Sequence, residues 1–272
     1  MTCGFIDNCA LPAPFPPLWA IAWGQDQYGL WADLQIKGVN QRMRWIRPGV
    51  FLMGSPEDEP GRDDGEVQHE VTLTKGYWLA DTACTQELWE KVMGDNKSRF
   101  KSDVQLPVEN VSWDDCQDFI RAVNENFSGP KLRLPTEAEW EYACRAGTET
   151  PFSFGKKITT KQVNYNGNYP YNNGVKGEYR KKAVTVKELT CNQWGLFQMH
   201  GNVFEWCADR YGEYEQESVK DPKGPADGED RVLRGGCWFN LGRDVRSAFR
   251  FRLTPGFRSS DIGFRFSLGQ KG

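Results

Sequence analysis

The sequence predicts an α+β domain in which a few capped helices are set among many short strands and long polar connections. Two helices begin at capping boxes, Ser112 with Asp115 and Thr136 with Glu139, which place an acidic side chain at the third helical position. The segments after Trp194 are short, alternate with turns and show no internal repeat. The 272 residues suffice for one large domain or two small ones, and no break is evident after about residue 40.

Residues 1–40 are predicted to form an N-terminal arm or lead-in, and residues 41–272 the folded domain. The first 23 residues carry four prolines and no basic segment, unlike a signal peptide, and no apolar run is long enough to cross a bilayer. Either the chain is cytoplasmic, or it begins after a removed signal with Cys3 or Cys9 close to a lipidated N-terminus. Membrane attachment is expected only through such a lipid; the alternative is a proline-rich arm.

In the first half of the domain, residues 44–55 are predicted to form one strand that ends in a turn at Gly54, and residues 71–79 a second strand. The acidic stretch 57–66 is rich in Gly and Pro, which predicts a loop between them. A helix is expected over residues 85–92, because a hydroxyl residue precedes apolar residues at helical spacing.

The two capping boxes open helices over residues 113–124 and 137–146. Residues 147–190 are polar and rich in Gly, Asn and Tyr. A connection of this length inside a compact domain is typically functional or stabilised by a ligand. The apolar positions of the first helix make one stripe: Trp113, Cys116, Phe119, Ile120 and Val123.

Composition narrows the class of function. The net charge is −3, which does not favour a nucleic acid or an anionic membrane as partner. Aromatic residues make up 13% of the chain, which fits irregular backbone folded over buried rings, or an adhesive surface. There are eight Cys without a CxxC motif and only two His, His69 and His200, so buried free thiols are expected rather than a zinc or thioredoxin-like site.

Two polar patterns stand out in the last third of the chain. Oxygen-bearing side chains at Gln198, Asn202 and Glu205 surround a glycine and could hold Ca²⁺. The pattern alone favours a turn at Asn202 and an arginine partner for Glu205.

Eight arginines between residues 231 and 265 alternate with phenylalanines. The pattern favours internal arginines that bond loop carbonyls, since a guanidinium has five donors.

Six motifs resemble the formylglycine-generating-enzyme, or sulfatase-modifying-factor, family. They follow in the family's order from about residue 40 to the end, and they imply its loop-rich C-type-lectin-like fold. The motifs are GVFLMGS at 49–55, VSWDDC at 111–116, RLPTEAEWEYACRAG at 133–147, GLFQMHGNVFEW at 195–206, RVLRGGCW at 231–238 and IGFRF at 262–266.

The resemblance implies the fold without the family's activity. Enzymes of the family bind copper and oxidise a substrate cysteine with two cysteines, whose matching positions here are Asn240 and Val245. Neither residue can form the thiolate that a soft copper ion needs, so no copper is expected. Cys237 stands where relatives carry Ser. One displaced thiol cannot replace two.

The resemblance also implies calcium. Glu205 and the carbonyls of Gly201 and Val203 match family ligands, while Gln198 stands where relatives carry Asn or Asp and would be a weaker ligand. The stretch 164–179 is similar to a second calcium region of the family. No cofactor is required for the function expected below.

Residues 237–261 contain no Lys, Glu, Gln or Met, and mutation of only the adenines in an AAC codon produces none of these four. This is typical of diversity-generating retroelements, and the chain resembles their variable proteins; the alternative is ordinary drift. The variable set, expected to face solvent and bind ligand, is Cys237, Phe239, Asn240, Leu241, Asp244, Val245, Phe249, Phe251, Leu253, Thr254, Gly256, Phe257, Ser259, Ser260 and Asp261. Interleaved Trp238, Pro255 and arginines would hold the backbone.

The resulting hypothesis is a non-enzymatic, receptor- or adhesin-like protein at the cell surface or outside the cytoplasm. It would act as a monomer on a protein or cell-surface ligand. Two alternatives stay open: a formylglycine-generating oxidase acting on sulfatase cysteines, and a Ca²⁺-dependent carbohydrate lectin. No EPN- or QPD-type sugar motif supports the lectin.

Overall fold

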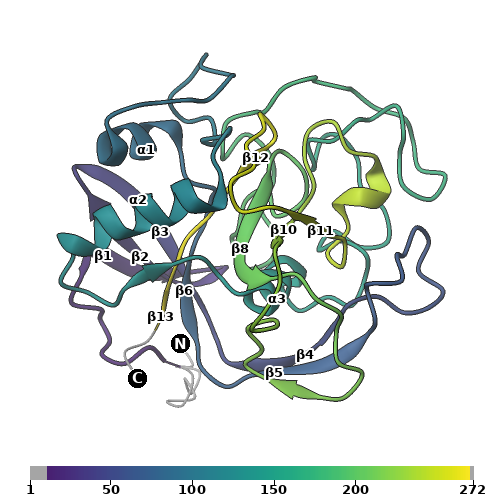
Figure 1. Cartoon of the computed structure of the whole chain (residues 1–272), viewed down its shortest axis with the longest axis horizontal. Coiled ribbons are helices and arrows are strands. Elements are labelled where there is room, and N and C mark those ends of the chain that lie inside the picture. The colour runs from purple at the N-terminus through teal and green to yellow at the C-terminus, as the bar shows by residue number, and fades with distance from the viewer. Residues whose placement is uncertain (1–10, 270–272) are drawn as a thin grey trace, which may run out of the picture.

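The computed structural model describes residues 11–269, which form three sheets and three α-helices (Figure 1). The largest sheet has the strand order β1-β2-β3-β6-β13-β7. Its last two members come from distant parts of the chain, because β13 near the C-terminus inserts between β6 and β7. The strands are β1 (Ala20–Asp26), β2 (Gly29–Ile36), β3 (Val39–Ile46), β6 (Tyr77–Ala80), β13 (Ser267–Gly269) and β7 (Leu132–Arg133).

The predicted lead-in of residues 1–40 is wrong from residue 20 onward, because β1 and β2 form an antiparallel meander with β3. In β2 the residues alternate between buried and partly exposed, and the buried Ala32 and Leu34 belong to the main core. This alternation is the ordinary pattern of a strand that packs on one face. The sequence from Lys37 to Gly38 supplies a two-residue turn with both residues at positive φ, 46° and 85°. Residues 1–10 lie outside the described chain.

Each of the two strands predicted early in the domain is in fact two strands in different sheets. Residues 44–55 divide at Pro48 into the end of β3 and β4 (Gly49–Met53). Residues 71–79 divide around Gly76 into β5 (His69–Leu73) and β6. A Cβ on Gly76 would lie 2.3 Å from the Trp45 ring, so only glycine fits this crossing between sheets.

The helices confirm the prediction closely. They are α1 (Gln86–Met93), α2 (Trp113–Glu125) and α3 (Glu137–Arg145). Both capping boxes are present, with Ser112 and Thr136 accepting from the backbone of Asp115 and Glu139. Each such cap stabilises its helix by about 1 kcal/mol.

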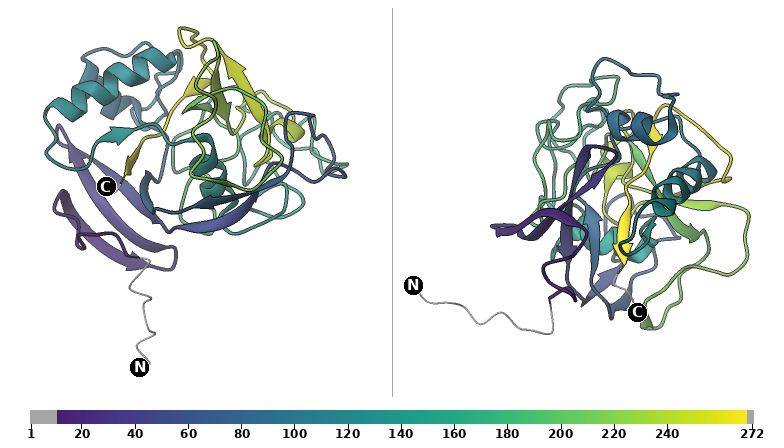
Figure 2. Two further views of the ribbon diagram at one scale, coloured as in Figure 1. Left: turned by 60° about the horizontal axis from the view of Figure 1, so that its bottom comes forward. Right: turned by 90° about the vertical axis from the view of Figure 1, so that its left-hand side faces the viewer.

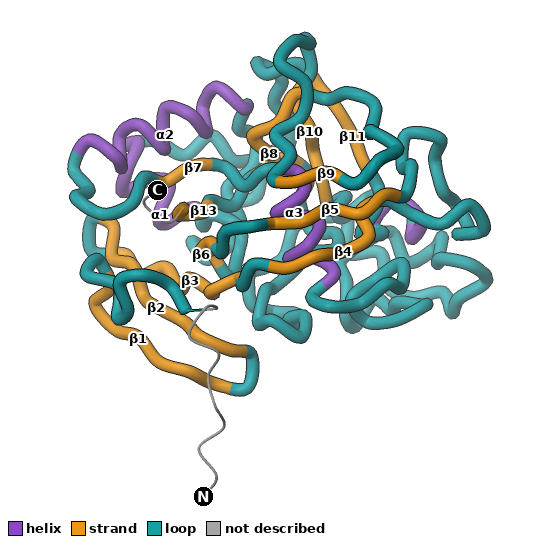
Figure 3. The backbone as a smooth tube through the Cα atoms, turned by 90° about the horizontal axis from the view of Figure 1, so that it is seen from below, coloured by secondary structure: helices purple, strands orange, loops and turns teal. Residues whose placement is uncertain are grey.

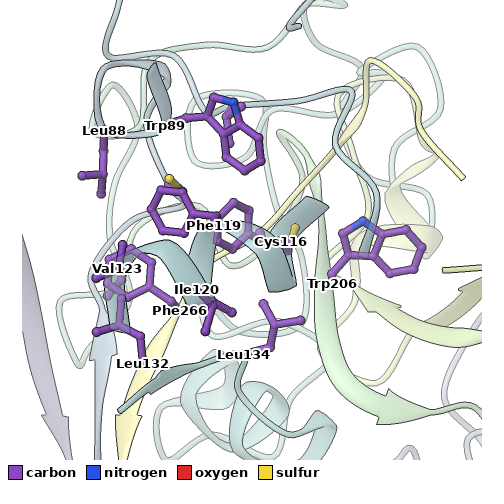
Figure 4. Close-up of a cluster of buried hydrophobic side chains, with 14 of the residues drawn as sticks. Leu88, Trp89, Cys116, Phe119, Ile120, Val123, Leu132, Leu134, Trp206 and Phe266 are labelled. Carbon is purple, nitrogen blue, oxygen red and sulfur yellow. The ribbon is translucent and has the colours of Figure 1, made fainter. Parts of the chain in front are cut away.

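The main core lies between α1, α2 and the large sheet. The predicted stripe of α2 is buried there, except that Trp113 is half-buried (Figure 4). The Trp89 and Phe119 rings are stacked with centroids 5.5 Å apart, and Phe264 meets both edge-on. These contacts join the helices to the C-terminal strands that carry the candidate site.

A four-stranded sheet in the order β11-β10-β8-β12 (Figure 1) and a three-stranded sheet in the order β4-β5-β9 (Figure 3) complete the domain. Residues 147–190 contain no helix or strand, as predicted, yet they bury their own apolar cluster around Phe152 and Tyr171. The strands are β8 (Phe204–Arg210), β9 (Val219–Lys220), β10 (Arg231–Arg234), β11 (Arg250–Leu253) and β12 (Ile262–Gly263).

Six cysteines lie in the described chain, and all are free thiols. Five are buried, as expected from their spacing, and only Cys191 is partly exposed. Cys3 and Cys9, the proposed lipidation positions, lie outside the described residues.

Candidate ligand-binding face

Residues 237–261 run from the end of β10 across the surface to the start of β12. They include the short 3₁₀ helix η2 (Gly242–Val245) and strand β11 (Figure 1). Gly235 and Gly236 turn the chain out of β10 with φ of 90° and 71°. A Cβ on Gly236 would lie 2.5 Å from the carbonyl oxygen of Asp244, so the turn requires glycine.

Three phenylalanine side chains of the variable set face solvent. Phe239, Phe251 and Phe257 are 41%, 41% and 44% exposed. Thr254 and Gly256 are exposed beside them. Seven further members are half-buried: Asn240, Leu241, Asp244, Phe249, Leu253, Ser259 and Ser260.

Three members of the variable set do not face solvent, and the prediction was wrong for them. Cys237 and Val245 are 0% exposed and Asp261 is 5% exposed. Cys237 belongs to the main core and Val245 to the cluster around Phe152. They are buried because the chain dips inward after the Gly-Gly turn, at the end of η2 and just before β12.

An aromatic group supports the Phe239 end of the surface. Trp238 lies edge-on to Phe239 and to Phe100, with ring centroids 5.1 and 5.7 Å apart. The Tyr179 ring stacks on Trp238 at 6.3 Å. Phe100 and Tyr179 come from loops far away in the sequence, and no sequence pattern links them to this surface.

Two further rings rest on strand β8. Phe251 stacks on the buried Phe204 with centroids 5.3 Å apart, and Phe249 lies 6.4 Å from the same ring. Phe249 and Leu253 pack against the main core, so they anchor β11 as well as contribute to the surface. We use the name binding face for the exposed and half-buried members of the variable set.

Beneath the binding face lies a network of buried ion pairs. Arg234 bonds the carboxylates of Glu137 and Glu141 and the carbonyls of Ser247 and Ala248. Arg250 makes two bonds of 2.7 and 2.9 Å to Glu137. Burial alone would raise the pKa of Glu137, but the nearby guanidinium charges of Arg250 and Arg234 outweigh it and lower that pKa.

A second pair of carboxylates holds Arg246. Its guanidinium bonds Glu59 and Glu66 at 2.7 Å and the carbonyl of Gly61 at 2.7 Å. The acidic loop predicted at residues 57–66 is therefore bound to the end of η2. Arg265 likewise bonds Glu205 and two carbonyls. The prediction of internal arginines is confirmed for these positions, whereas Arg243, Arg252 and Arg258 lie on the surface.

The positions that match the copper ligands of the family cannot hold copper. The Asn240 side-chain oxygen accepts the backbone N–H of Cys237 at 2.8 Å, and Val245 is enclosed by apolar side chains. Burial raises the pKa of the Cys237 thiol well above its usual range, so it stays protonated. The residues present do not fit a copper centre.

The side chains among the predicted calcium ligands, Gln198 and Glu205, are bonded within the protein. Both carboxylate oxygens of Glu205 accept from Arg265, and one also accepts from the Trp140 indole at 2.7 Å. The Gln198 amide bonds Asn202 and the Thr185 carbonyl. The sequence pattern favoured a turn at Asn202 and an arginine partner for Glu205. Asn202 has a positive φ of 66°, and Arg265 bonds Glu205. Gly201 and Val203 lie in the same buried turn.

The two histidines do not form a catalytic group. His200 accepts the N–H of Ser153 at 3.1 Å and bonds the Val245 carbonyl at 2.8 Å through its other nitrogen. Burial lowers the pKa of His200 to about 4 and raises the pKa of the neighbouring Cys144 thiol to about 12. The pair is therefore neutral at physiological pH, opposite to an activated thiolate–imidazolium pair. His69 bonds the Val67 carbonyl and lies against the Tyr214 ring, with ring centroids 4.8 Å apart.

Residues 11–269 contain neither a metal-binding cluster nor a membrane-spanning helix. Three or more His, Cys, Asp or Glu side chains do not gather anywhere in this range to hold a metal ion. Within the same range, none of the helices has the length and apolar character needed to cross a membrane.

Residues 33–268 match the family described as the sulfatase-modifying factor enzyme 1-like domain. The formylglycine-generating enzyme of Streptomyces coelicolor is 36% identical over 233 residues, which cover 79% of this chain and 72% of that enzyme. The mouse enzyme (Mus musculus) is 35% identical over 206 residues, covering 72% and 52%. Serine/threonine-protein kinase pkn1 of Chlamydia caviae is 31% identical over 259 residues, covering 84% and 38%.

The chain spans only part of the length of these relatives. It covers 38% of pkn1 from Chlamydia caviae, 23% of pkn1 from Chlamydia pneumoniae and 52% of the mouse enzyme. Among solved structures, Treponema denticola variable protein 1 superposes with a TM-score of 0.75 at 27% identity, covering 88% of this chain and 99% of that one. PvdO from Pseudomonas aeruginosa shares the fold, with a TM-score of 0.73 at 24% identity and coverage of 92% and 98%. The chain thus belongs to the sulfatase-modifying-factor family, with the C-type-lectin-like fold of that family and a likeness to variable proteins of diversity-generating retroelements.

Proposed function

We propose that this chain is a non-enzymatic ligand-binding protein and that the binding face recognises the ligand. The observation that carries the proposal is the trio of solvent-facing phenylalanines, Phe239, Phe251 and Phe257, held over a buried ionic scaffold. Exposed aromatic side chains gathered in one surface segment mark interaction sites on soluble domains. Aromatic residues also supply a large share of the hot spots in protein interfaces.

The arrangement separates specificity from stability. The ion pairs of Arg234, Arg246 and Arg250 use buried carboxylates from outside the variable segment. Exposed members of the binding face can therefore change without removing a contact that holds the backbone, since exposed substitutions change stability by only about 0.5 kcal/mol. A ligand-binding role tolerates such variation, whereas a catalytic site does not.

The likeness to formylglycine-generating enzymes supports the alternative function, oxidation of a cysteine in a sulfatase. That chemistry in the family uses a pair of thiolates on copper, and this chain has Asn240 and Val245 in their place. The second alternative, a Ca²⁺-dependent lectin, needs free oxygen ligands, and Glu205 is bonded to Arg265. Both alternatives are therefore less well supported than a binding role.

The proposed ligand is a protein or another cell-surface molecule, and the proposed location is the cell surface. The likeness to Treponema denticola variable protein 1 supports a recognition surface whose residues vary. Variation of the binding face by adenine-directed mutagenesis belongs to the same proposal. A near-identical, Asn-rich copy of the coding segment beside a reverse-transcriptase gene would support this origin.

Replacing Phe239, Phe251 and Phe257 together with Ser is expected to weaken ligand binding strongly without unfolding the domain. Phe249 is left unchanged because it packs on the main core. The probe is a phage-displayed random peptide library selected on the unmodified chain. Selected peptides are expected to bind the triple variant at least about tenfold more weakly, since losing one hot spot costs about 2 kcal/mol. The melting temperature should stay nearly unchanged.

The matched control replaces Val50, Val104 and Val175 with Ser, since these exposed valines lie outside the binding face. The control is expected to bind the peptides as the unmodified chain does. A large fall in melting temperature of the phenylalanine variant would make these rings part of the core and contradict the proposal. Aldehyde formation on a sulfatase-type cysteine peptide by the copper-loaded chain would also contradict it.

A further inference from the structure

Two loops that are distant in the sequence lie side by side at the Phe239 end of the binding face. The first loop, residues 95–103, follows α1, and the second, residues 176–182, belongs to the long polar connection. Just beyond them, the Val186 N–H donates to the carbonyl of Gln105 at 3.0 Å. The right-hand view of Figure 2 shows the loop after α1 beside that connection. We use the name basic rim for these two loops.

Aromatic contacts fix the basic rim against the binding face. Phe100 of the first loop and Tyr179 of the second both contact Trp238, with ring centroids 5.7 and 6.3 Å from that ring. Trp238 in turn meets the exposed Phe239 ring, with centroids 5.1 Å apart. A ligand that binds Phe239 therefore lies next to both loops.

The basic rim is positively charged in an acidic chain. It contains seven basic and three acidic side chains, a net charge of +4, so the remaining residues of this chain of net charge −3 carry −7. Two of its basic side chains form ion pairs, Lys97 with Asp95 at 3.6 Å and Arg180 with Glu178 at 3.5 Å. Within residues 11–269 the other five are exposed and form no ion pair: Arg99, Lys101, Lys176, Lys181 and Lys182.

Two of these five cations lie over the rings that contact Trp238. The Arg99 guanidinium carbon is 5.5 Å from the centroid of Phe100, and the Lys181 Nζ is 5.9 Å from the centroid of Tyr179. An aromatic face attracts a cation without neutralising its charge. The rings therefore hold unpaired positive charge at the margin of the binding face.

The binding face itself supplies little charge. Its one charged member is Asp244, which bonds Arg243 at 3.3 Å. Arg243, Arg252 and Arg258, which lie between its members, each pair with a carboxylate. The basic rim lies outside the variable segment 237–261, so its charge stays constant when the binding face changes.

We propose that the basic rim binds an acidic segment of a protein ligand whose apolar side chains contact the binding face. The inference rests on the proposed ligand-binding function and specifies its partner. Carboxylates of the ligand complement the five cations without ion pairs, and an apolar side chain beside them complements Phe239. Because the basic rim is constant, the variable residues select among acidic partners.

A long polyanion, such as a sulfated polysaccharide or a nucleic acid, fits the surface less well. It matches the charge of the basic rim, but it brings no aliphatic side chains to the exposed phenylalanines. It also meets the net negative charge of the rest of the chain, which opposes its approach. The combination of cations and phenyl rings therefore favours a protein ligand.

Parallel peptide selections test the chemistry of the partner. The probe is a phage-displayed random peptide library, selected on the unmodified chain and on a rim variant that carries Arg99→Gln, Lys181→Gln and Lys182→Gln. These side chains are exposed, so the rim variant should keep its melting temperature. Peptides selected on the unmodified chain are expected to contain more Asp and Glu than Lys and Arg, and those from the rim variant to lack this excess. Peptides without an acidic excess on the unmodified chain would overturn the proposal.

Association rates measure the contribution of the charge. Peptides selected on the unmodified chain are expected to associate with the rim variant at least about threefold more slowly at low salt, because opposite charges steer the encounter. The difference should vanish at about 1 M salt, where the screening length is about 3 Å. The matched control carries Lys75→Gln, Lys220→Gln and Lys223→Gln, which remove the same charge around β5 and β9, and it should associate as the unmodified chain does.

The phenylalanine variant of the previous subsection separates the two proposals. If it binds the peptides weakly while the rim variant and the lysine control behave alike, the basic rim has no part in binding and this inference alone fails. If it binds them as the unmodified chain does, the ligand-binding function itself fails. Heparin, a sulfated polysaccharide, is expected to bind weakly; tight heparin binding that survives the phenylalanine substitutions would overturn the acidic protein as partner.

Discussion

Replacing Arg234 with Met is expected to lower the free energy of unfolding by about 3–5 kcal/mol, because it leaves buried carboxylates without their partner. Arg234 is fully buried and bonds Glu137 and Glu141, both of which are buried as well. It also bonds the carbonyls of Ser247 and Ala248 at 2.7 and 3.1 Å, so the start of β11 should loosen too. Urea denaturation at neutral pH measures the loss.

The matched control is Arg252→Met. The Arg252 side chain is largely exposed, and within residues 11–269 it forms a single ion pair, a 3.7 Å contact with Asp230. Such a surface pair contributes about 0–1 kcal/mol, so the control variant should unfold close to the unmodified chain. Equal losses in the two variants would mean that the buried network does not hold the binding face.

Replacing Val245 with Asp is expected to destabilise the fold by about 3–5 kcal/mol, since it buries a charge without a partner. Val245 is enclosed by a cluster that includes Phe152, Tyr165 and Tyr171. This substitution lies within the reach of adenine mutagenesis, yet we expect the fold to reject it. Phe257→Asp, an exposed change in the same segment, should alter stability by only about 0.5 kcal/mol.

The loss of stability caused by Val245→Asp should depend on pH. Burial raises the folded-state pKa of the new Asp above its unfolded value of about 3.9. Above the unfolded pKa the unfolded state is charged more readily than the folded state, so the destabilisation grows as pH rises through this window. At a pH below both pKa values it shrinks to the effect of a neutral carboxyl group. Destabilisation that is the same at acidic and neutral pH would contradict a buried carboxyl group.

The helices and the family could be predicted because their signals are local. Capping boxes at Ser112 and Thr136 fix helix starts from residues three positions apart, and motifs such as RVLRGGCW are continuous. The strands were harder to predict. No local sequence signal shows that residues 44–55 contribute to two sheets, because the division depends on which distant strands they pair with: β3 pairs with β6, and β4 with β5.

The sequence predicts which segment forms the candidate site, but not which of its side chains are buried. A mutational signature reports which codons change, and it does not report which side chains are buried, so Cys237, Val245 and Asp261 were placed on the surface. The arginine partners could not be assigned either, because Arg246 and Glu59 are 187 residues apart in the chain. Only the fold brings such pairs together.

The central claim is that the exposed part of the binding face sets ligand choice while the rest of the chain holds the fold. The most direct measurement randomises only the exposed positions Phe239, Phe251, Thr254, Gly256 and Phe257 in a displayed library and selects for binding to lysozyme, an arbitrary protein target. The account predicts clones that bind lysozyme, melt near the temperature of the unmodified chain, and lose binding when the original residues are restored. A library that yields no binder, or whose members mostly fail to fold, would contradict it.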